Sequence, residues 1–189
     1  MNLILASSSP RRKQVMDELG LVYRVIPSDF EENHALHSDS IALVTDFAMK
    51  KAEDVLTHNP GAIVIGSDTI VHGPDGRLLG KAKQYTDAFR MIQRLQASSC
   101  DMYTGVAVLS KEKRNIGYTK ATVHFKSLTD KEIKMYLDDP EADWMDKAGA
   151  FAVQGKAKGW IEKIDGEYST MIGLSKSMLT AYLQEFGVL

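Results

Sequence analysis

The stretch Asn2-Leu-Ile-Leu-Ala-Ser-Ser-Ser-Pro-Arg-Arg12 decides how the fold begins. Its apolar run stops at three serines, and the amphipathic segment that follows ends at Gly20. This pattern predicts a strand, a tight loop and a helix. Ser9 is expected as the N-cap and Pro10 as the first helical residue, where a missing amide costs no hydrogen bond inside the helix.

The same turn gathers groups that bind anions. Backbone amides, the positive end of the helix dipole, the hydroxyls of Ser7 and Ser9 and the guanidinium groups of Arg11 and Arg12 are all expected there. The turn therefore predicts an anion site, most simply a phosphate site. The alternative is a capped helix whose arginines are only solvated.

Length and composition narrow the class of protein. A chain of 189 residues with 44% hydrophobic content can bury a full core, as one α/β domain over residues 1–189 or as two closely packed lobes. A net charge of −2 gives no overall attraction to nucleic acid or to an anionic membrane. The single cysteine, Cys100, excludes an internal disulfide and a cysteine metal cluster. No apolar run approaches the ~20 residues of a membrane span, so a soluble, cytoplasmic protein is expected.

Two adjacent carboxylates, Glu31 and Glu32, follow a short predicted strand at Tyr23–Pro27. Carboxylates at a strand end are either surface charge or ligands for a hard divalent cation. His34 and His37 follow in a polar loop, but no cysteine or further histidine lies nearby, which argues against a zinc site.

An acid at the end of a buried strand is the next candidate. A helix is predicted over Ser38–Leu56, and it carries Lys51, which faces solvent unless another segment supplies an anion. The strand Ala62–Gly66 then leads into Asp68 and Thr69. Open α/β sheets place their ligand chemistry at the carboxyl ends of such strands, so Asp68 is expected to have a task there.

The rest of the chain continues the α/β pattern. The turn residues Gly73–Gly76 predict a hairpin that leads to Lys81 beside a glycine. A glycine- and alanine-rich stretch at Asp146–Gly155, which contains Gln154, permits close approach of a strand or a ligand. The other predicted elements are a helix from a Thr86 cap to Leu95, strands Cys100–Leu109 and Ile116–Phe125, a helix from a capping box at Thr129–Glu132, a strand Trp160–Ile164, and a last helix from Gly173 with Leu174, Met178, Ala181 and Tyr182 inward.

Several short motifs recur in order along nearly the whole chain. They are SSSPRR at 7–12, Glu31/Glu32, Lys51, GSDT at 66–69, LGK at 79–81, YTG at 103–105, DKAGAF at 146–151 and QG at 154–155. Together they resemble the Maf family of nucleoside triphosphate pyrophosphatases.

The resemblance implies a fold and a reaction. The fold is α/β, with a mixed twisted β-sheet flanked by helices and two lobes around a deep cleft, Maf/ITPase-like and commonly dimeric. The reaction is hydrolysis of a nucleoside triphosphate to the monophosphate and pyrophosphate with Mg²⁺, Mn²⁺ or another divalent ion. The implied site residues are Ser7, Ser9, Arg11, Arg12, Glu32, Lys51, Asp68, Lys81 and Gln154, with Asp68 as proton acceptor and with Arg11, Thr69 and Gln154 at positions associated with substrate choice.

The pair Asp68-Thr69 is similar to the family branch that acts on dTTP and UTP, whereas the branch that acts on 7-methyl-GTP usually has glutamine after the aspartate. The chemistry suits these residues, because Glu32 and Asp68 can hold a hard cation while arginines and lysines neutralise a triphosphate. Lys51 and Lys81 would act there as point charges.

Other readings remain open at this stage. One is a pyrophosphatase of another substrate, such as 7-methyl-GTP. Another is a regulator of septum formation that binds nucleotide or nucleic acid without turnover, which would use the anion site without needing Asp68. A serine hydrolase would need a base beside Ser7–Ser9, and a dehydrogenase would need a glycine pattern that the first turn lacks.

Overall fold

The computed structural model describes residues 2–33, 39–142, 144–145 and 147–189. Its internal contacts divide the chain into two compact units. The first comprises Met1–Thr69, Tyr103–Thr119 and Tyr168–Leu189, and the second comprises Ile70–Met102 and Lys120–Glu167. The single domain expected over 1–189 therefore stays a prediction, as does the cleft.

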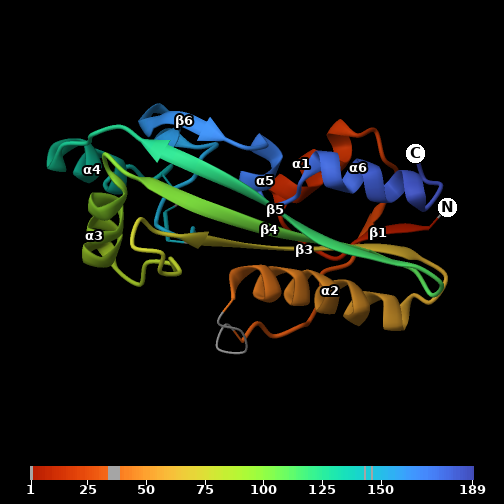
Figure 1. The fold of residues 1–189 in the computed structure, drawn as a ribbon. Helices are drawn as coiled ribbons and strands as arrows, with labels where there is room; N and C mark the ends of the chain where they lie inside the picture. The colour runs from red at the N-terminus through yellow and green to blue at the C-terminus, as the bar shows by residue number, and fades with distance from the viewer. Residues whose placement is uncertain (1, 34–38, 143, 146) are drawn as a thin grey trace. The chain divides into compact units, whose positions relative to one another are not determined.

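The described elements form an α/β fold (Figure 1). The helices are α1 (Pro10–Glu18), α2 (Ser40–His58), α3 (Tyr85–Leu95), α4 (Asp130–Leu137), the 3-10 helix η2 (Lys156–Trp160), α5 (Tyr168–Met171) and α6 (Lys176–Glu185). The strands are β1 (Leu3–Leu5), β2 (Arg24–Val25), β3 (Ile63–His72), β4 (Ser99–Leu109), β5 (Arg114–Phe125) and β6 (Ile161–Asp165). They form one sheet in the order β2-β1-β3-β4-β5-β6. Strand β1 is parallel to β2 and β3, while β5 and β6 are antiparallel, so the predicted mixed sheet is confirmed.

The first turn has the predicted form. Helix α1 begins at Pro10 with Ser9 as its N-cap residue, although the Ser9 side chain makes no capping hydrogen bond. The helix ends at Glu18, and Gly20 follows the C-cap residue Leu19 with a φ of 66°, the left-handed conformation that glycine adopts without strain. The amides of Gly20 and Leu21 donate to Asp17 and Met16, a Schellman ending.

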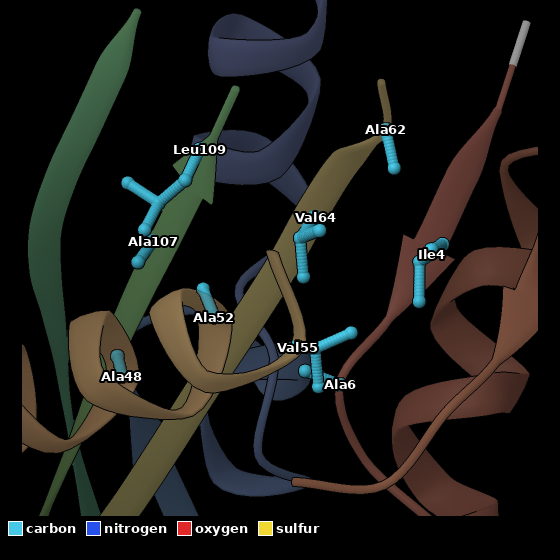
Figure 2. Packing of buried hydrophobic residues seen from close by; sticks show 9 residues of the cluster. All are labelled: Ile4, Ala6, Ala48, Ala52, Val55, Ala62, Val64, Ala107 and Leu109. Atoms are coloured by element: carbon cyan, nitrogen blue, oxygen red, sulfur yellow. The ribbon is translucent and has the colours of Figure 1, made fainter. Parts of the chain in front are cut away.

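In the first unit, α2 lies unusually close to β3 and β4. A Cβ atom built on Gly66 would lie 2.1 Å from the Ala48 carbonyl oxygen, and one built on Gly105 would lie 2.1 Å from that of Val44. Only glycine at these two strand positions lets the helix backbone approach so closely. Ala48 and other small residues belong to the buried cluster under the helix (Figure 2). Figure 1 shows α2 on one side of these strands and α1 and α6 on the other.

Two predicted boundaries were wrong, and one short helix was not predicted. Strand β2 covers only Arg24–Val25 of the expected Tyr23–Pro27, because its partner β1 offers only three residues for pairing. Helix α3 has Gln84 as its N-cap residue instead of Thr86. The 3-10 helix η2 was not predicted.

The last helix was also placed wrongly. It begins at Lys176, after Ser175, whose hydroxyl accepts from the Met178 amide. Its buried residues are Leu179 and Leu183, whereas Ala181, expected inward, is exposed. Leu174 is buried but lies before the helix, so its position does not set the phase of the buried face of α6.

The second unit holds the predicted hairpin and capping box. Leu79 N donates to Val71 O over 2.7 Å across the turn that contains Gly76, whose φ is 71°. Thr129 and Glu132 cap α4 reciprocally, as the sequence predicts. Among the described residues, no helix is both long enough and apolar enough to cross a bilayer.

Candidate active site

Lys51, on α2, joins two carboxylates. Its Nζ atom lies 2.5 Å from Glu32 Oε1 and 2.6 Å from Asp68 Oδ1. The Lys51 and Asp68 side chains are only 12% and 6% exposed, whereas that of Glu32 is 39% exposed. The structure thus brings together three of the predicted site residues. Lys51 is not simply solvent-facing, because Glu32 and Asp68 supply the anions with which it pairs.

The segment that carries Glu32 is fastened to α2 by several contacts. The ring of Phe30 packs edge-on against Phe47 with centroids 5.4 Å apart. One carboxylate oxygen of Asp54 accepts from the Ser28 hydroxyl over 2.9 Å and from the Asp29 amide over 2.8 Å. These contacts hold the chain just before Glu32 on the helix that presents Lys51.

Asp68 occupies the middle of β3, which corrects the expectation that it lies at a strand's carboxyl end. The parallel pairing of β1 with β3 runs only from Ile63 to Ile65, so Asp68 lies just beyond the end of the parallel segment. Asp68 therefore follows the parallel-paired segment but lies inside a strand that continues to His72. Within the described part of the chain, Asp68 Oδ2 is buried and has no hydrogen-bond partner. A buried acceptor of this kind needs a ligand, an ion or a proton to satisfy it.

Arg12 is held in a fixed orientation at the start of α1. Its Nε donates to the Gly173 carbonyl oxygen over 2.9 Å, and its Nη1 donates to Ser7 Oγ over 3.1 Å. Burial lowers the pKa of the Arg12 guanidinium, and the negative charge of Asp68 opposes that shift. The guanidinium remains cationic, because an arginine pKa lies far above neutrality.

The Gly173 carbonyl oxygen was not predicted as part of the site. Besides Arg12 Nε it accepts from the Ser67 hydroxyl over 2.7 Å, and that hydroxyl also lies 2.8 Å from the Gly105 carbonyl oxygen. Gly173 has a φ of 101°, a conformation that strains other residues. The only sequence signal for this role is a glycine shortly before a helix N-cap, and the predicted last helix wrongly included Gly173.

Two threonines beside this cluster interact directly. Thr69 Oγ1 lies 2.8 Å from Thr104 Oγ1, and Thr104 Oγ1 donates to the Thr170 carbonyl oxygen over 2.7 Å. Thr104 is completely buried, and it belongs to the YTG motif, for which the sequence suggested no role.

The remaining predicted site residues lie on the first turn and in the second unit. Ser9 donates its backbone amide to Ser7 Oγ over 3.2 Å, and Arg11 is half-buried on the same turn. In the second unit, exposed Lys81 pairs with Ala148 in an isolated bridge, and Gln154 is half-buried. The roles of Lys81 and Gln154 stay predictions. Three residues named from the sequence, His34, His37 and Asp146, lie outside the described residues.

The donor set suits a hard divalent cation. Across the described ranges, no group of three or more histidine, cysteine, aspartate or glutamate side chains could hold a metal. The pair Glu32 and Asp68 nevertheless offers carboxylate oxygens, one of them the buried, unpartnered Asp68 Oδ2. Mg²⁺ in enzymes is commonly held by only one or two protein carboxylates together with waters and substrate phosphates, so the residues present fit such an ion.

Comparison with known proteins places the chain in a family. A family model described as Maf-like protein matches residues 2–186. A protein named dTTP/UTP pyrophosphatase from Bacillus cereus is 37% identical over 186 residues, which is 98% of this chain and 96% of that relative. A protein of the same name from Bacillus thuringiensis subsp. konkukian gives the same figures. The Staphylococcus aureus Ham1 protein structure aligns with a TM-score of 0.52 and 11% identity, covering 98% of this chain and 100% of that chain, which is a similarity of fold. Because the family model and the relatives span nearly the whole chain, the chain belongs to the Maf family.

Proposed function

We propose that the protein is a nucleoside triphosphate pyrophosphatase that hydrolyses dTTP and UTP to the monophosphate and pyrophosphate. The observation that carries this proposal is Asp68, a buried carboxylate with one oxygen on Lys51 and the other without a partner among the described residues. The relatives named dTTP/UTP pyrophosphatase support the substrate class.

Asp68 acts as the proton acceptor. Its unpartnered Oδ2 is free to accept a proton from an attacking water, while Lys51 keeps the carboxylate in place through Oδ1. A positioned general base accelerates a reaction by roughly 10²–10⁴-fold. Burial excludes bulk water, which would otherwise weaken this hydrogen bonding.

Glu32 and Asp68 would hold a divalent cation, Mg²⁺ or Mn²⁺. When bound, such an ion supplies positive charge to the triphosphate and lowers the pKa of a water molecule that it coordinates. Removal of divalent ions with EDTA is expected to abolish turnover, and addition of Mg²⁺ or Mn²⁺ is expected to restore it.

The turn Ser7–Arg12 binds phosphate oxygens. Arg12 is already oriented by Gly173 and Ser7, so it can meet a phosphate with little further loss of side-chain freedom. Arg11 and Ser9 contribute from the same turn, and Lys81 adds positive charge. Thr69 and Gln154 read the base through hydrogen bonds.

The proposal extends to the location of the protein and its oligomeric state. We propose a cytoplasmic homodimer that does not act on nucleic acid, since a net charge of −2 gives no general attraction to a polyanion. Sedimentation equilibrium measures the oligomeric state directly, and a monomer at every concentration would reject the dimer.

The test is pyrophosphate release from UTP, dTTP, CTP, GTP, 7-methyl-GTP and ITP, with and without Mg²⁺ or Mn²⁺. Wild type, Asp68→Asn and Asp46→Asn are compared. Asp46 pairs with Lys50 over 2.7 Å on α2, so its variant is a matched control for the loss of a lysine-bound aspartate. We expect turnover of UTP and dTTP that falls at least ~100-fold in Asp68→Asn and is kept in Asp46→Asn.

Other outcomes of this assay reject parts of the proposal. Preferred turnover of 7-methyl-GTP would reject dTTP and UTP as the substrates and favour a pyrophosphatase of 7-methyl-GTP. Nucleotide binding without any turnover would favour the non-catalytic regulator. Near-normal rates in Asp68→Asn would remove Asp68 from catalysis.

A further inference from the structure

The hydrogen bonds of Thr69, Thr104 and Thr170 have a fixed direction. Thr104 has a single hydroxyl proton, and a backbone carbonyl oxygen can only accept. The 2.7 Å contact between Thr104 Oγ1 and the Thr170 carbonyl oxygen therefore uses that proton. In the 2.8 Å contact between the two threonine hydroxyls, Thr69 must then donate and Thr104 must accept.

The acceptor at the end of this chain is itself held in place. The Thr170 carbonyl oxygen also accepts the Gly173 amide over 3.2 Å, so it belongs to the turn whose Gly173 carbonyl orients Arg12. Thr104 and Thr170 are both fully buried, so water does not compete for these bonds. The fold therefore fixes the donor-to-acceptor direction of this hydrogen-bond series, from Thr69 through Thr104 to the Thr170 carbonyl oxygen.

Thr69 is turned toward the candidate site. A Cβ atom built on Gly173 would lie 3.5 Å from Thr69 Oγ1 and 3.3 Å from Arg12 Nε, so both side chains converge on the same backbone position. Thr69 is only partly buried, unlike its neighbours in the strand. Its proton is used internally, so its oxygen can only accept a hydrogen bond from a bound molecule.

We propose that Thr104 is a positioning residue that fixes the Thr69 hydroxyl as an acceptor, and that this acceptor receives the N3–H group of uracil or thymine. This inference rests on the proposed function. Once attached to the sugar, uracil and thymine each carry one N–H group, at N3, whereas cytosine has an unprotonated, accepting N3. An acceptor-only Thr69 therefore favours UTP and dTTP and disfavours CTP, because two facing acceptors leave both unsatisfied.

The test is a double-mutant cycle on the ratio of kcat/KM for UTP to that for CTP. In Thr104→Val the Thr69 hydroxyl loses its internal acceptor and can donate to cytosine, so we expect the ratio to fall at least ~10-fold. Thr104→Ser keeps the chain and is expected to keep the ratio. In the Thr69→Val background, Thr104→Val is expected to change the ratio no further.

Thr119→Val is the matched control, because Thr119 Oγ1 accepts from the Thr170 hydroxyl over 2.8 Å and takes no part in the chain to Thr69. Thermal unfolding checks each variant, and Thr104→Ala takes the place of Thr104→Val if the latter does not fold. An unchanged ratio in folded Thr104→Val, or an equal fall in the Thr69→Val background, would overturn the inference.

The sugar 3′-hydroxyl is the other donor that dTTP and UTP share. A Thr104→Val variant that loses selectivity against 3′-deoxy-UTP while its UTP-to-CTP ratio is unchanged would place the contact on the sugar and reject the base assignment. A wild-type protein that hydrolyses no pyrimidine nucleotide would reject the proposed function itself, which separates the two failures.

Discussion

Lys51 Nζ, on a helix, lies 2.6 Å from Asp68 Oδ1, on a strand, although the two residues are 17 positions apart in the sequence. The contact exists because glycines at Gly66 and Gly105 admit the α2 backbone against the strands. The ammonium takes a place between two carboxylates that a divalent cation would also favour.

Lys51 should weaken metal binding in the nucleotide-free protein. A cation held by Glu32 and Asp68 must compete with the ammonium, so Lys51→Met is expected to raise Mn²⁺ affinity at least ~10-fold. Mn²⁺ electron paramagnetic resonance or calorimetry without nucleotide measures this. Lys50→Met, next to it on α2 and paired with Asp46, should leave the affinity unchanged. Equal affinity in Lys51→Met and wild type would contradict the prediction.

The close approach of α2 should make two glycines indispensable. Gly66→Ala or Gly105→Ala puts a Cβ atom 2.1 Å from a helix carbonyl oxygen, so each is expected to cost about 3 kcal/mol or more in the free energy of unfolding. Urea unfolding provides the measurement. Gly61→Ala is the control, since a Cβ atom there meets nothing within 4 Å. A loss below 1 kcal/mol in either variant would show that the helix can move away easily.

Arg12 should not tolerate replacement by lysine. Its Nε and Nη1 atoms bond two different acceptors in a fork that a single ammonium cannot reproduce. Arg12→Lys is expected to lower the free energy of unfolding by about 1–3 kcal/mol and to raise KM for UTP. Arg11→Lys serves as the comparison and should change the free energy of unfolding less. A larger loss of unfolding free energy in Arg11→Lys than in Arg12→Lys would contradict the prediction.

Cys100 should lower stability at alkaline pH. Burial raises the pKa of its thiol to about 12 from an ordinary value of 9.0. Between those values the unfolded chain loses the proton while the folded chain keeps it, so the free energy of unfolding falls as pH rises. The slope for one such group is at most about 1.4 kcal/mol per pH unit. Urea unfolding of wild type and Cys100→Ala at pH 8 and pH 10.5 should show a steeper fall for wild type, and parallel falls would refute the shift.

The local parts of this fold were readable from the sequence. The serine and proline at the start of α1 and the Thr129 capping box act within one turn of chain, and both have the predicted form. The phase of α6 was misread because Leu174 is buried outside the helix, and only tertiary packing decides that.

The candidate site was predictable in its residue types but not in its connections. A buried acid and a lysine can be named from a sequence. Their contact, however, depends on the close approach of α2 to β3 and β4, which Gly66 and Gly105 permit and which is seen only in the folded structure. The role of the Gly173 carbonyl was out of reach, because every residue has a carbonyl and no side chain marks this one. The Thr104 hydroxyl was visible within a motif, but its direction depends on a backbone oxygen 66 positions away.

The contact between Arg12 and Gly173 joins residues 161 positions apart. During synthesis on the ribosome, this turn is made before the oxygen that orients its arginine, because Gly173 follows Arg12 by 161 positions. A nascent or prematurely terminated chain that lacks Gly173 therefore carries the predicted phosphate-binding motif without the anchor that aims it. Completion of the segment up to Gly173 thus becomes a condition for the ordered Arg12 side chain.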